Sequence, residues 1–358
     1  MKQETTNSYD IAIQQKRVWK YILDKNRSEI ALLQIHIAGV PDVGRLQQAI
    51  LVCTAEKEIF NQVYNQYKGF NFPVTYVSSQ GNQLLIMSAA SDPQDRMNEA
   101  RQSYDKGEPF AFFLVEAGKE NFILEVYFPA LSFDKTSCAL FFEALCRQYF
   151  KEKLSGHTDE SEFIQFIDFS EWQNDVLSEE AENGKSYWNN VMNKEVPLFI
   201  PYAKHANKQL PDYHYRQVII PQSLIQSIEQ FVETHNTDIY HYLLSAYVFL
   251  LHKLCSSDNI LVGIKANGRT SDEVKNIYGF LDQYIPVVYQ VTPSNNFSEQ
   301  LKSVFREVEN AYKWQFFYSP EQFSARKQID HDFLPFLFDF EELAASYSDD
   351  KVAISLRQ

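Results

Sequence analysis

The chain has 358 residues, of which 45% are hydrophobic and 22% charged, and its formal net charge is -14. This length accommodates one large domain or two ordinary ones with a real core, and the composition is ordinary for a globular protein. The acidic balance, without a Lys/Arg stripe, argues against nucleic acid as a partner. With 11 glycines and no GxGxxG or GxxxxGK[ST] motif, a nucleotide-dependent enzyme is also disfavoured.

The first half of the chain alternates strand-like and helix-like segments. Helical spacing of apolar residues predicts a helix from Ile11 to Leu23. The segments expected after it, in chain order, are a strand over 30–37, a helix over 42–54, strands over 74–77 and 83–87, a strand over 121–128 and a helix over 136–150. This alternation predicts a mixed α/β (α+β) lobe.

A second lobe follows the polar segment KEKLSGHTDESE at 151–162, which is typical of a surface loop or linker. The helix expected over 239–254 is apolar on nearly all sides and hence buried. Strands over 259–264 and 285–291 and an amphipathic helix over 298–314 complete the pattern. We expect two related lobes, at 1–165 and 166–358.

Cysteines and the N-terminal segment indicate the compartment. Cys53, Cys138, Cys146 and Cys255 show no CxxC or paired spacing, which predicts neither disulfides nor a metal site. The start, MKQETTNSYD, lacks an apolar signal region, and no run reaches the roughly 18 apolar residues of a membrane span. We expect a cytoplasmic protein that is not inserted in a membrane.

Several short motifs occur in a fixed order along the chain. They are Gln15-Lys-Arg17-Val-Trp19, Phe169-Ser-Glu-Trp172-Gln173, Ser186-Tyr187-Trp188, and, within 238–287, Val262-Gly263, Gly268-Arg269, Gly279-Phe280 and Pro286. In this order and at these separations they resemble the condensation domain of nonribosomal peptide synthetases, over nearly the whole chain.

The resemblance implies two chloramphenicol-acetyltransferase-like lobes that form a V-shaped pseudodimer, with the family's last part missing beyond Gln358. Members join a donor acyl thioester to an acceptor amine in a tunnel between the lobes, in natural product biosynthesis. Each substrate arrives on the phosphopantetheine arm of a carrier protein. The implied partners are therefore a carrier protein and neighbouring synthetase domains, such as an adenylation domain or a tailoring enzyme, and we expect no cofactor bound by this chain itself.

The family's catalytic signature, HHxxxDG, falls on Pro129 to Lys135. Pro129 and Ala130 replace both histidines, Asp134 matches the acid, and Lys135 replaces the glycine. Imidazole titrates near neutrality and a methyl group cannot, so the signature lacks its acid–base group. The comparison implies a degenerate active site with no catalytic residue.

The cyclising branch of the family has the signature DxxxxDxxS instead. Asp134 and Ser137 match its last two residues, but Pro129 stands where the first acid belongs. Ser137, with Thr136 as competitor, also fits a helix N-cap, and we favour that role. In the family the aspartate meets an arginine, so we expect a structural pair between Asp134 and Arg269. The alternative is a capping Asp134 and a solvated Arg269.

These residues favour a condensation-like domain that has lost activity and serves as a scaffold or protein-interaction domain in an assembly line. Whether it is an enzyme stays open. The alternative is an active, divergent condensation or heterocyclisation domain, an acyl or peptidyl transferase that works by positioning its substrates. A third possibility is an incomplete relic. For the scaffold we expect Phe128, Leu131 and Phe133 to narrow the tunnel.

Overall fold

The computed structural model describes residues 8–25, 29–55, 57–78, 84–87, 92–151, 164–179, 181–201, 215–327, 334–341 and 346–356. Contacts divide the chain into two compact units. The first contains residues 1–178, 267–282 and 342–358, and the second contains 179–266 and 283–341. The units are therefore not the contiguous lobes 1–165 and 166–358 expected from the sequence, because two later segments join the first unit.

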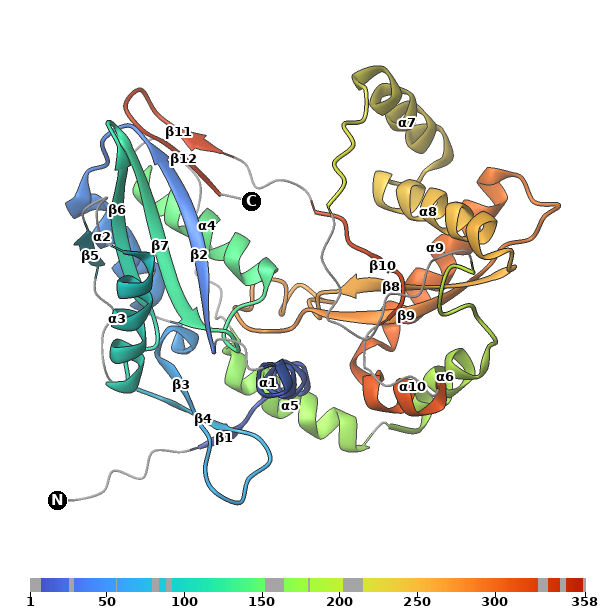
Figure 1. Ribbon diagram of the computed structural model, residues 1–358, viewed down its shortest axis with the longest axis horizontal. Helices are drawn as coiled ribbons and strands as arrows, with labels where there is room; N and C mark the ends of the chain where they lie inside the picture. Colours follow the sequence, from blue (N-terminus) through green and yellow to red (C-terminus); the bar gives the residue numbers. More distant parts are fainter. Residues whose placement is uncertain are drawn as a thin grey trace. The chain divides into compact units, whose positions relative to one another are not determined.

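The first unit is built on a six-stranded sheet. Its strand order is β11 (Tyr347–Ser348), β12 (Ala353–Leu356), β2 (Ile30–Ala38), β7 (Asn121–Pro129), β6 (Ala111–Gly118) and β5 (Leu84–Met87). Neighbouring strands are antiparallel except for β5 and β6. A small second sheet has the order β1 (Tyr9–Asp10), β4 (Val74–Val77), β3 (Gln62–Asn65). Figure 1 shows both sheets.

Helices cover both faces of the large sheet. Successive side chains of a strand point to opposite faces, so apolar residues of one strand can contact helices on both sides. Phe113 and Tyr127 pack with Ala100 of α3 (Pro93–Asp105) on one face. On the other face the ring of Phe112 contacts Phe141 of α4 (Lys135–Tyr149), with a centroid separation of 6.1 Å. The helix α2 (Val43–Ala55) packs beside α4. The first unit also includes α1 (Ile13–Lys25), the short helix η1 (Glu58–Asn61) and most of α5 (Phe166–Glu179).

A buried ion pair fixes α3 on the sheet. Arg96 Nε lies 2.7 Å from Glu125 Oε2, and the same carboxylate accepts hydrogen bonds from Tyr127 Oη at 2.9 Å and Gln34 Nε2 at 3.1 Å. Burial raises the pKa of Glu125, but the hydrogen bonds and the charge of Arg96 outweigh burial and lower it. The ion pair therefore attaches α3, which buries few apolar side chains, to the sheet.

The second unit contains a three-stranded sheet with the order β10 (Leu337–Phe338), β8 (Asn259–Ala266), β9 (Gln283–Gln290). Its helices are α6 (Ala181–Asn193), α7 (Gln222–His235), α8 (Ile239–Cys255), α9 (Phe297–Lys313), the short η2 (Gln315–Phe317) and α10 (Pro320–Lys327). Pro286 lies within β9, where its missing N–H is tolerated because β9 is an edge strand among the described strands. Gly263 is needed in β8, because a Cβ there would lie 2.5 Å from Leu334 Cδ1.

The expected helices and strands all occur, with ends that differ by a few residues. The elements not expected are β1, the short helices η1 and η2, β3, α3, β6, the helices α5 to α7, α10 and the strands β10 to β12. The segment expected to be a linker, 151–162, lies outside the described residues from 152 onward. None of the helices in the described ranges is long and apolar enough to cross a membrane.

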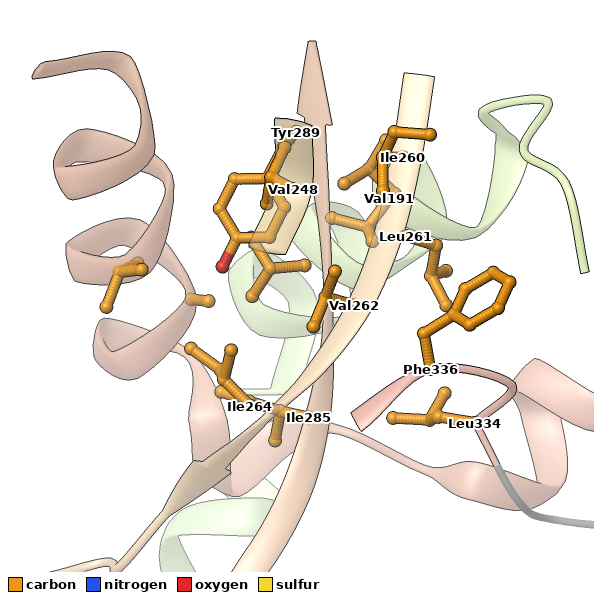
Figure 2. Close-up of a cluster of buried hydrophobic side chains, with 14 of the residues drawn as sticks. Val191, Val248, Ile260, Leu261, Val262, Ile264, Ile285, Tyr289, Leu334 and Phe336 are labelled. Carbon is orange, nitrogen blue, oxygen red and sulfur yellow. The ribbon is translucent and has the colours of Figure 1, made fainter. Parts of the chain in front are cut away.

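The core of the second unit encloses a tyrosine hydroxyl that has no hydrogen-bond partner among the described residues, that of Tyr289. Figure 2 shows the Tyr289 ring among apolar side chains, close to Val248 of α8. Burial raises the pKa of Tyr289 well above its usual value, so the hydroxyl stays protonated. A buried hydroxyl without a partner costs free energy, because it has lost its hydrogen bonds to water.

We therefore expect Tyr289→Phe to stabilise the protein by about 1 kcal/mol, or to leave its stability unchanged, because it removes an unpaired polar group. Urea denaturation measures the free energy of unfolding. Tyr312→Phe is the matched control in the same unit, since the Tyr312 hydroxyl donates to the Lys265 carbonyl at 3.1 Å and its removal should cost about 1 kcal/mol. Equal losses in both variants would contradict the expectation.

Candidate functional site

The site lies where β7 ends and α4 begins, as the motif at 129–137 predicts. β7 ends at Pro129, and the Ala130 N–H donates to the Glu29 carbonyl at 2.7 Å. A turn follows, in which the Ser132 N–H donates to the Pro129 carbonyl at 2.8 Å. Asp134 then adopts an extended conformation and is the N-cap of α4. The turn therefore presents the Asp134 carboxylate at the start of the helix.

Both carboxylate oxygens of Asp134 are saturated with donors. Oδ1 accepts from the Ser137 N–H at 2.7 Å and from Arg269 Nη2 at 3.1 Å. Oδ2 accepts from Arg269 Nη1 at 2.9 Å. It also accepts from the backbone N–H groups of Leu281 at 2.9 Å and Asp282 at 3.0 Å. The side chain is only 1% exposed, so this carboxylate meets protein donors instead of water.

Arg269 is enclosed as completely as its partner, with a side chain that is 3% exposed. Besides the carboxylate, the guanidinium donates to the Ile277 carbonyl from Nε at 3.1 Å and from Nη2 at 3.0 Å. Nη1 donates to the Asn267 carbonyl at 3.1 Å. The preceding Gly268 has a φ of 69°, in the left-handed region that glycine adopts without strain. The structure thus brings Asp134 and Arg269 together, and Arg269 is not a solvated turn residue.

Ser137 is not the N-cap of α4, contrary to the role favoured from the sequence. Asp134 caps the helix by accepting from the Ser137 N–H, which leaves the serine hydroxyl for other partners. Ser137 Oγ donates to the Gly279 carbonyl at 2.8 Å and accepts from the Gly279 N–H at 2.9 Å. It also accepts from Arg269 Nη2 at 2.9 Å. Thr136 is not the cap either, and its Oγ1 lies 3.4 Å from Asp282 Oδ1.

The electrostatics keep Asp134 ionised. Burial by itself raises the pKa of this carboxyl, but the charge and hydrogen bonds of Arg269 outweigh burial, and the backbone donors add to them, so the pKa is lowered from its usual value. A carboxylate with a lowered pKa and filled acceptor positions is a poor proton acceptor. The arrangement is suited to holding the chain in place.

The two histidine positions of the signature lie in apolar surroundings. Ala130 packs against a buried cluster that includes Ile11 and Leu131. The turn is held from α1 by Gln15, whose Nε2 donates to the Leu131 carbonyl at 2.8 Å and to Tyr64 Oη at 3.1 Å. Lys135, at the glycine position, is an exposed residue of the first turn of α4. None of these side chains supplies an acid–base group at the position of the missing imidazoles.

The bulky side chains of the turn belong to the apolar core of the first unit. Phe128 and Phe133 are both buried, and their rings lie 5.7 and 5.1 Å from that of Phe110. Phe133 also contacts Phe141 of α4 and Tyr278, so it joins the 267–282 segment to the same core. Burial inside this unit is sufficient to explain why these residues are large and apolar.

Among the described residues of the first unit, Ser132 and three cysteines are poor nucleophiles. Ser132 is fully buried, and its Oγ lies 3.4 Å from Tyr64 Oη. Burial raises the pKa of Cys53, Cys138 and Cys146 to about 12, so these thiols stay protonated. Across the described ranges, no group of three or more His, Cys, Asp or Glu residues could hold a metal ion.

Sequence reasoning identified Asp134, Ser137 and Arg269, but it missed their backbone partners. Gly279 was noted as part of a motif, yet its contact with Ser137 was not foreseen. A Cβ on Gly279 would lie 2.0 Å from Phe166 Cδ2, so α5 requires glycine there. Leu281 and Asp282 contribute only N–H groups to the carboxylate, and no residue type announces such a role.

Because the pair is dry, removing either member leaves a buried charge without its hydrogen-bonded counter-charge; for Arg269 only the Asp282 carboxylate, 3.8 Å from Nη1, would remain. We expect Asp134→Ala and Arg269→Ala each to cost about 3–5 kcal/mol of unfolding free energy. The double variant should lose much less than the sum, because it leaves neither charge without its partner. Chemical denaturation of the four proteins measures the coupling. Strictly additive losses would contradict a pair that acts as one unit.

The lowered pKa of Asp134 also predicts a pH dependence. The folded state binds fewer protons than the unfolded chain in acid, so the stabilisation is complete above the unfolded pKa, about 3.9, and is lost as pH falls through the folded pKa. Asp134→Asn should therefore be less stable than the unaltered chain at neutral pH, with a difference that shrinks below about pH 4. Unfolding free energies measured across this range test it, and a difference independent of pH would contradict it.

The sequence is similar to a known protein family and to curated proteins. The family model described as "Condensation domain" matches residues 7–326. Tyrocidine synthase 3 from Brevibacillus parabrevis is 25% identical over 322 residues, which are 86% of this chain and 5% of that protein. The chain therefore spans about a twentieth of this relative's length.

Two solved structures share the fold. The condensation domain from Monacolin K polyketide synthase MokA has a TM-score of 0.72 at 16% identity, over 98% of this chain and 85% of that one. A chain of the complex of the X-domain and OxyB from teicoplanin biosynthesis has a TM-score of 0.63 at 13% identity, over 100% of this chain and 83% of that one. The predicted mixed α/β fold is confirmed, and the chain belongs to the condensation-domain family.

Proposed function

We propose that this chain is a condensation-family domain that has lost peptide-bond-forming activity and serves as a scaffold in a nonribosomal-peptide assembly line. The observation that carries the proposal is that one motif lacks its two histidines but keeps its aspartate. Pro129 and Ala130 stand at the two histidine positions, while Asp134 keeps a complete set of hydrogen bonds with Arg269. The groups that chemistry requires are missing, and the groups that hold the backbone are present.

The geometry supports a structural role for the acid and the serine that remain. General acid–base catalysis needs a group within reach of the substrate whose pKa lies near the working pH. The pKa of Asp134 is lowered, and both oxygens of its carboxylate accept hydrogen bonds from protein donors. The Ser137 hydroxyl is shared between the backbone of Gly279 and the side chain of Arg269. Neither group is free to act on a substrate.

The scaffold part of the proposal draws on the relatives. Tyrocidine synthase 3 is a much longer protein than this chain, and the solved X-domain is described in a complex with OxyB. A domain of this fold can therefore bind another protein. By analogy, the partner here is a carrier protein, an adenylation domain or a tailoring enzyme. Any phosphopantetheine arm would arrive on the carrier protein.

The activity test uses the chain with donor and acceptor carrier proteins, each loaded with an aminoacyl phosphopantetheine. Mass spectrometry of the acceptor carrier should detect no dipeptidyl product above the background without the chain, because no imidazole or equivalent base stands at Ala130. Lys135→Ala is the matched control, since it changes an exposed residue of the same motif and leaves the Asp134 contacts in place.

The opposite outcome favours the alternative, an active divergent condensation or heterocyclisation domain. Turnover by the unaltered chain that persists in Lys135→Ala and disappears in Ser137→Ala would overturn the scaffold proposal. Circular dichroism of Ser137→Ala must show a folded protein for that comparison to count. Binding to the isolated carrier, adenylation and tailoring domains of the same assembly line, measured by calorimetry, tests the scaffold role separately.

A further inference from the structure

Two buried glutamines of the first unit have amide groups that nothing in the described part of the chain satisfies. Gln14 of α1 and Gln173 of α5 are each 1% exposed. Neither Oε1 nor Nε2 of either residue has a hydrogen-bond partner among the described residues. Buried amides are normally paired, because an amide taken from water without a replacement partner destabilises the fold.

These glutamines lie on two segments that touch. Ser170 Oγ of α5 donates to the Asp10 carbonyl at 3.2 Å, just before α1 begins. Gln173 lies three residues after Ser170, hence on the same face of α5. Gln14 lies four residues after Asp10, in the first turn of α1. The same contact therefore brings both amides to the region where α5 meets the start of α1.

Two other buried glutamines, one in the same helix and one in the second unit, have amides in which both polar atoms are hydrogen-bonded. Gln15 Nε2 donates to the Leu131 carbonyl, and its Oε1 accepts from the Ala12 N–H at 2.9 Å. Gln300 is also 1% exposed, with Nε2 donating to the Gln290 carbonyl at 2.9 Å and Oε1 accepting from the Thr292 N–H at 3.3 Å. Gln14 and Gln173 are equally buried and differ in having no such partners.

The chemistry of the two amides limits what can satisfy them. Each offers one acceptor oxygen and a nitrogen with two donor hydrogens. A cation would satisfy only the oxygens, and an anion only the nitrogens. A molecule that both donates and accepts satisfies all of them, and it must be small, because the amide atoms are closed to solvent. Water meets these conditions, since a buried water typically makes about three hydrogen bonds to otherwise unsatisfied groups.

We propose that Gln14 and Gln173 together hold an internal water site, of one or more long-lived molecules, between α1 and α5. The site joins the two helices through water, whereas Gln15 and Gln300 use direct bonds. It is independent of the proposed scaffold function, because it uses neither Asp134 nor Arg269 and needs no partner protein.

Oxygen-17 magnetic relaxation dispersion tests the proposal, because its amplitude reports the number of long-lived internal waters. Gln14→Met and Gln173→Met keep the length of each side chain but remove the amide. Each variant should lose an amplitude equivalent to at least one water relative to the unaltered chain. Gln300→Met, the matched control, should lose none, because its amide bonds directly to the backbone.

A crystal structure of the unaltered chain at high resolution gives a second test that does not depend on a folded variant. We expect ordered water within hydrogen-bond distance of both amides. Direct hydrogen bonds from the amides to each other or to other protein groups would overturn the proposal. An unchanged dispersion amplitude in folded Gln14→Met and Gln173→Met, or a loss in only one of them, would also overturn the shared site.

Discussion

One buried ion pair organises the centre of the first unit. Two opposite charges withdrawn from water stabilise a fold only when nearly every hydrogen-bonding position is filled, because the loss of hydration otherwise exceeds the attraction. Asp134 and Arg269 meet this condition through backbone groups of the 277–282 segment. The start of α4 and the course of residues 267–282 therefore depend on each other. The strands on both sides of that segment belong to the second unit, so the chain leaves the first unit at each of its ends.

This dependence gives a physical reason for the unequal fate of the motif. A residue whose task is to act on a substrate can be replaced without unfolding the domain, provided that the new side chain suits its surroundings. Ala130 does so, since it packs against an apolar cluster. Replacing Asp134 would instead leave Arg269 buried without its hydrogen-bonded carboxylate, with only Asp282 Oδ1 at 3.8 Å. Replacement of the histidines and retention of the acid are thus compatible in one short turn.

Much of this fold could be predicted from the sequence, and the successes share a cause. α8 and β7 were predicted because their patterns are local, a long apolar run in one case and a strand ending at a proline in the other. α3 was missed because it has few apolar residues and is fixed by Arg96, whose partner Glu125 lies in a distant strand. β6 was missed because it opens with a run of buried apolar residues, which does not distinguish a strand from a buried helix.

In the candidate site, too, contacts between residues distant in the sequence were not predicted. The motif predicted which side chains would meet, but it did not predict that backbone N–H groups would complete the carboxylate. The assignment of Ser137 as a cap failed because α4 begins at Lys135 with Asp134 as its N-cap, so Ser137 already lies in the first turn of the helix. Rules for local sequence cannot choose between two acceptable caps. In the structure the Ser137 hydroxyl is instead hydrogen-bonded to the backbone of Gly279, which is remote in the sequence.

The pairing of β12 with β2 has a consequence for how the protein is made. Ile354 pairs with Ile37, so a strand near one end of the described chain completes a sheet begun near the other. During synthesis β2 emerges early, and its edge stays open while the whole second unit is translated. An open strand edge can pair with other chains, and contacts between distant residues form slowly. The first unit therefore starts folding first and finishes last, and the waiting edge of β2 is where misassembly on the ribosome would begin.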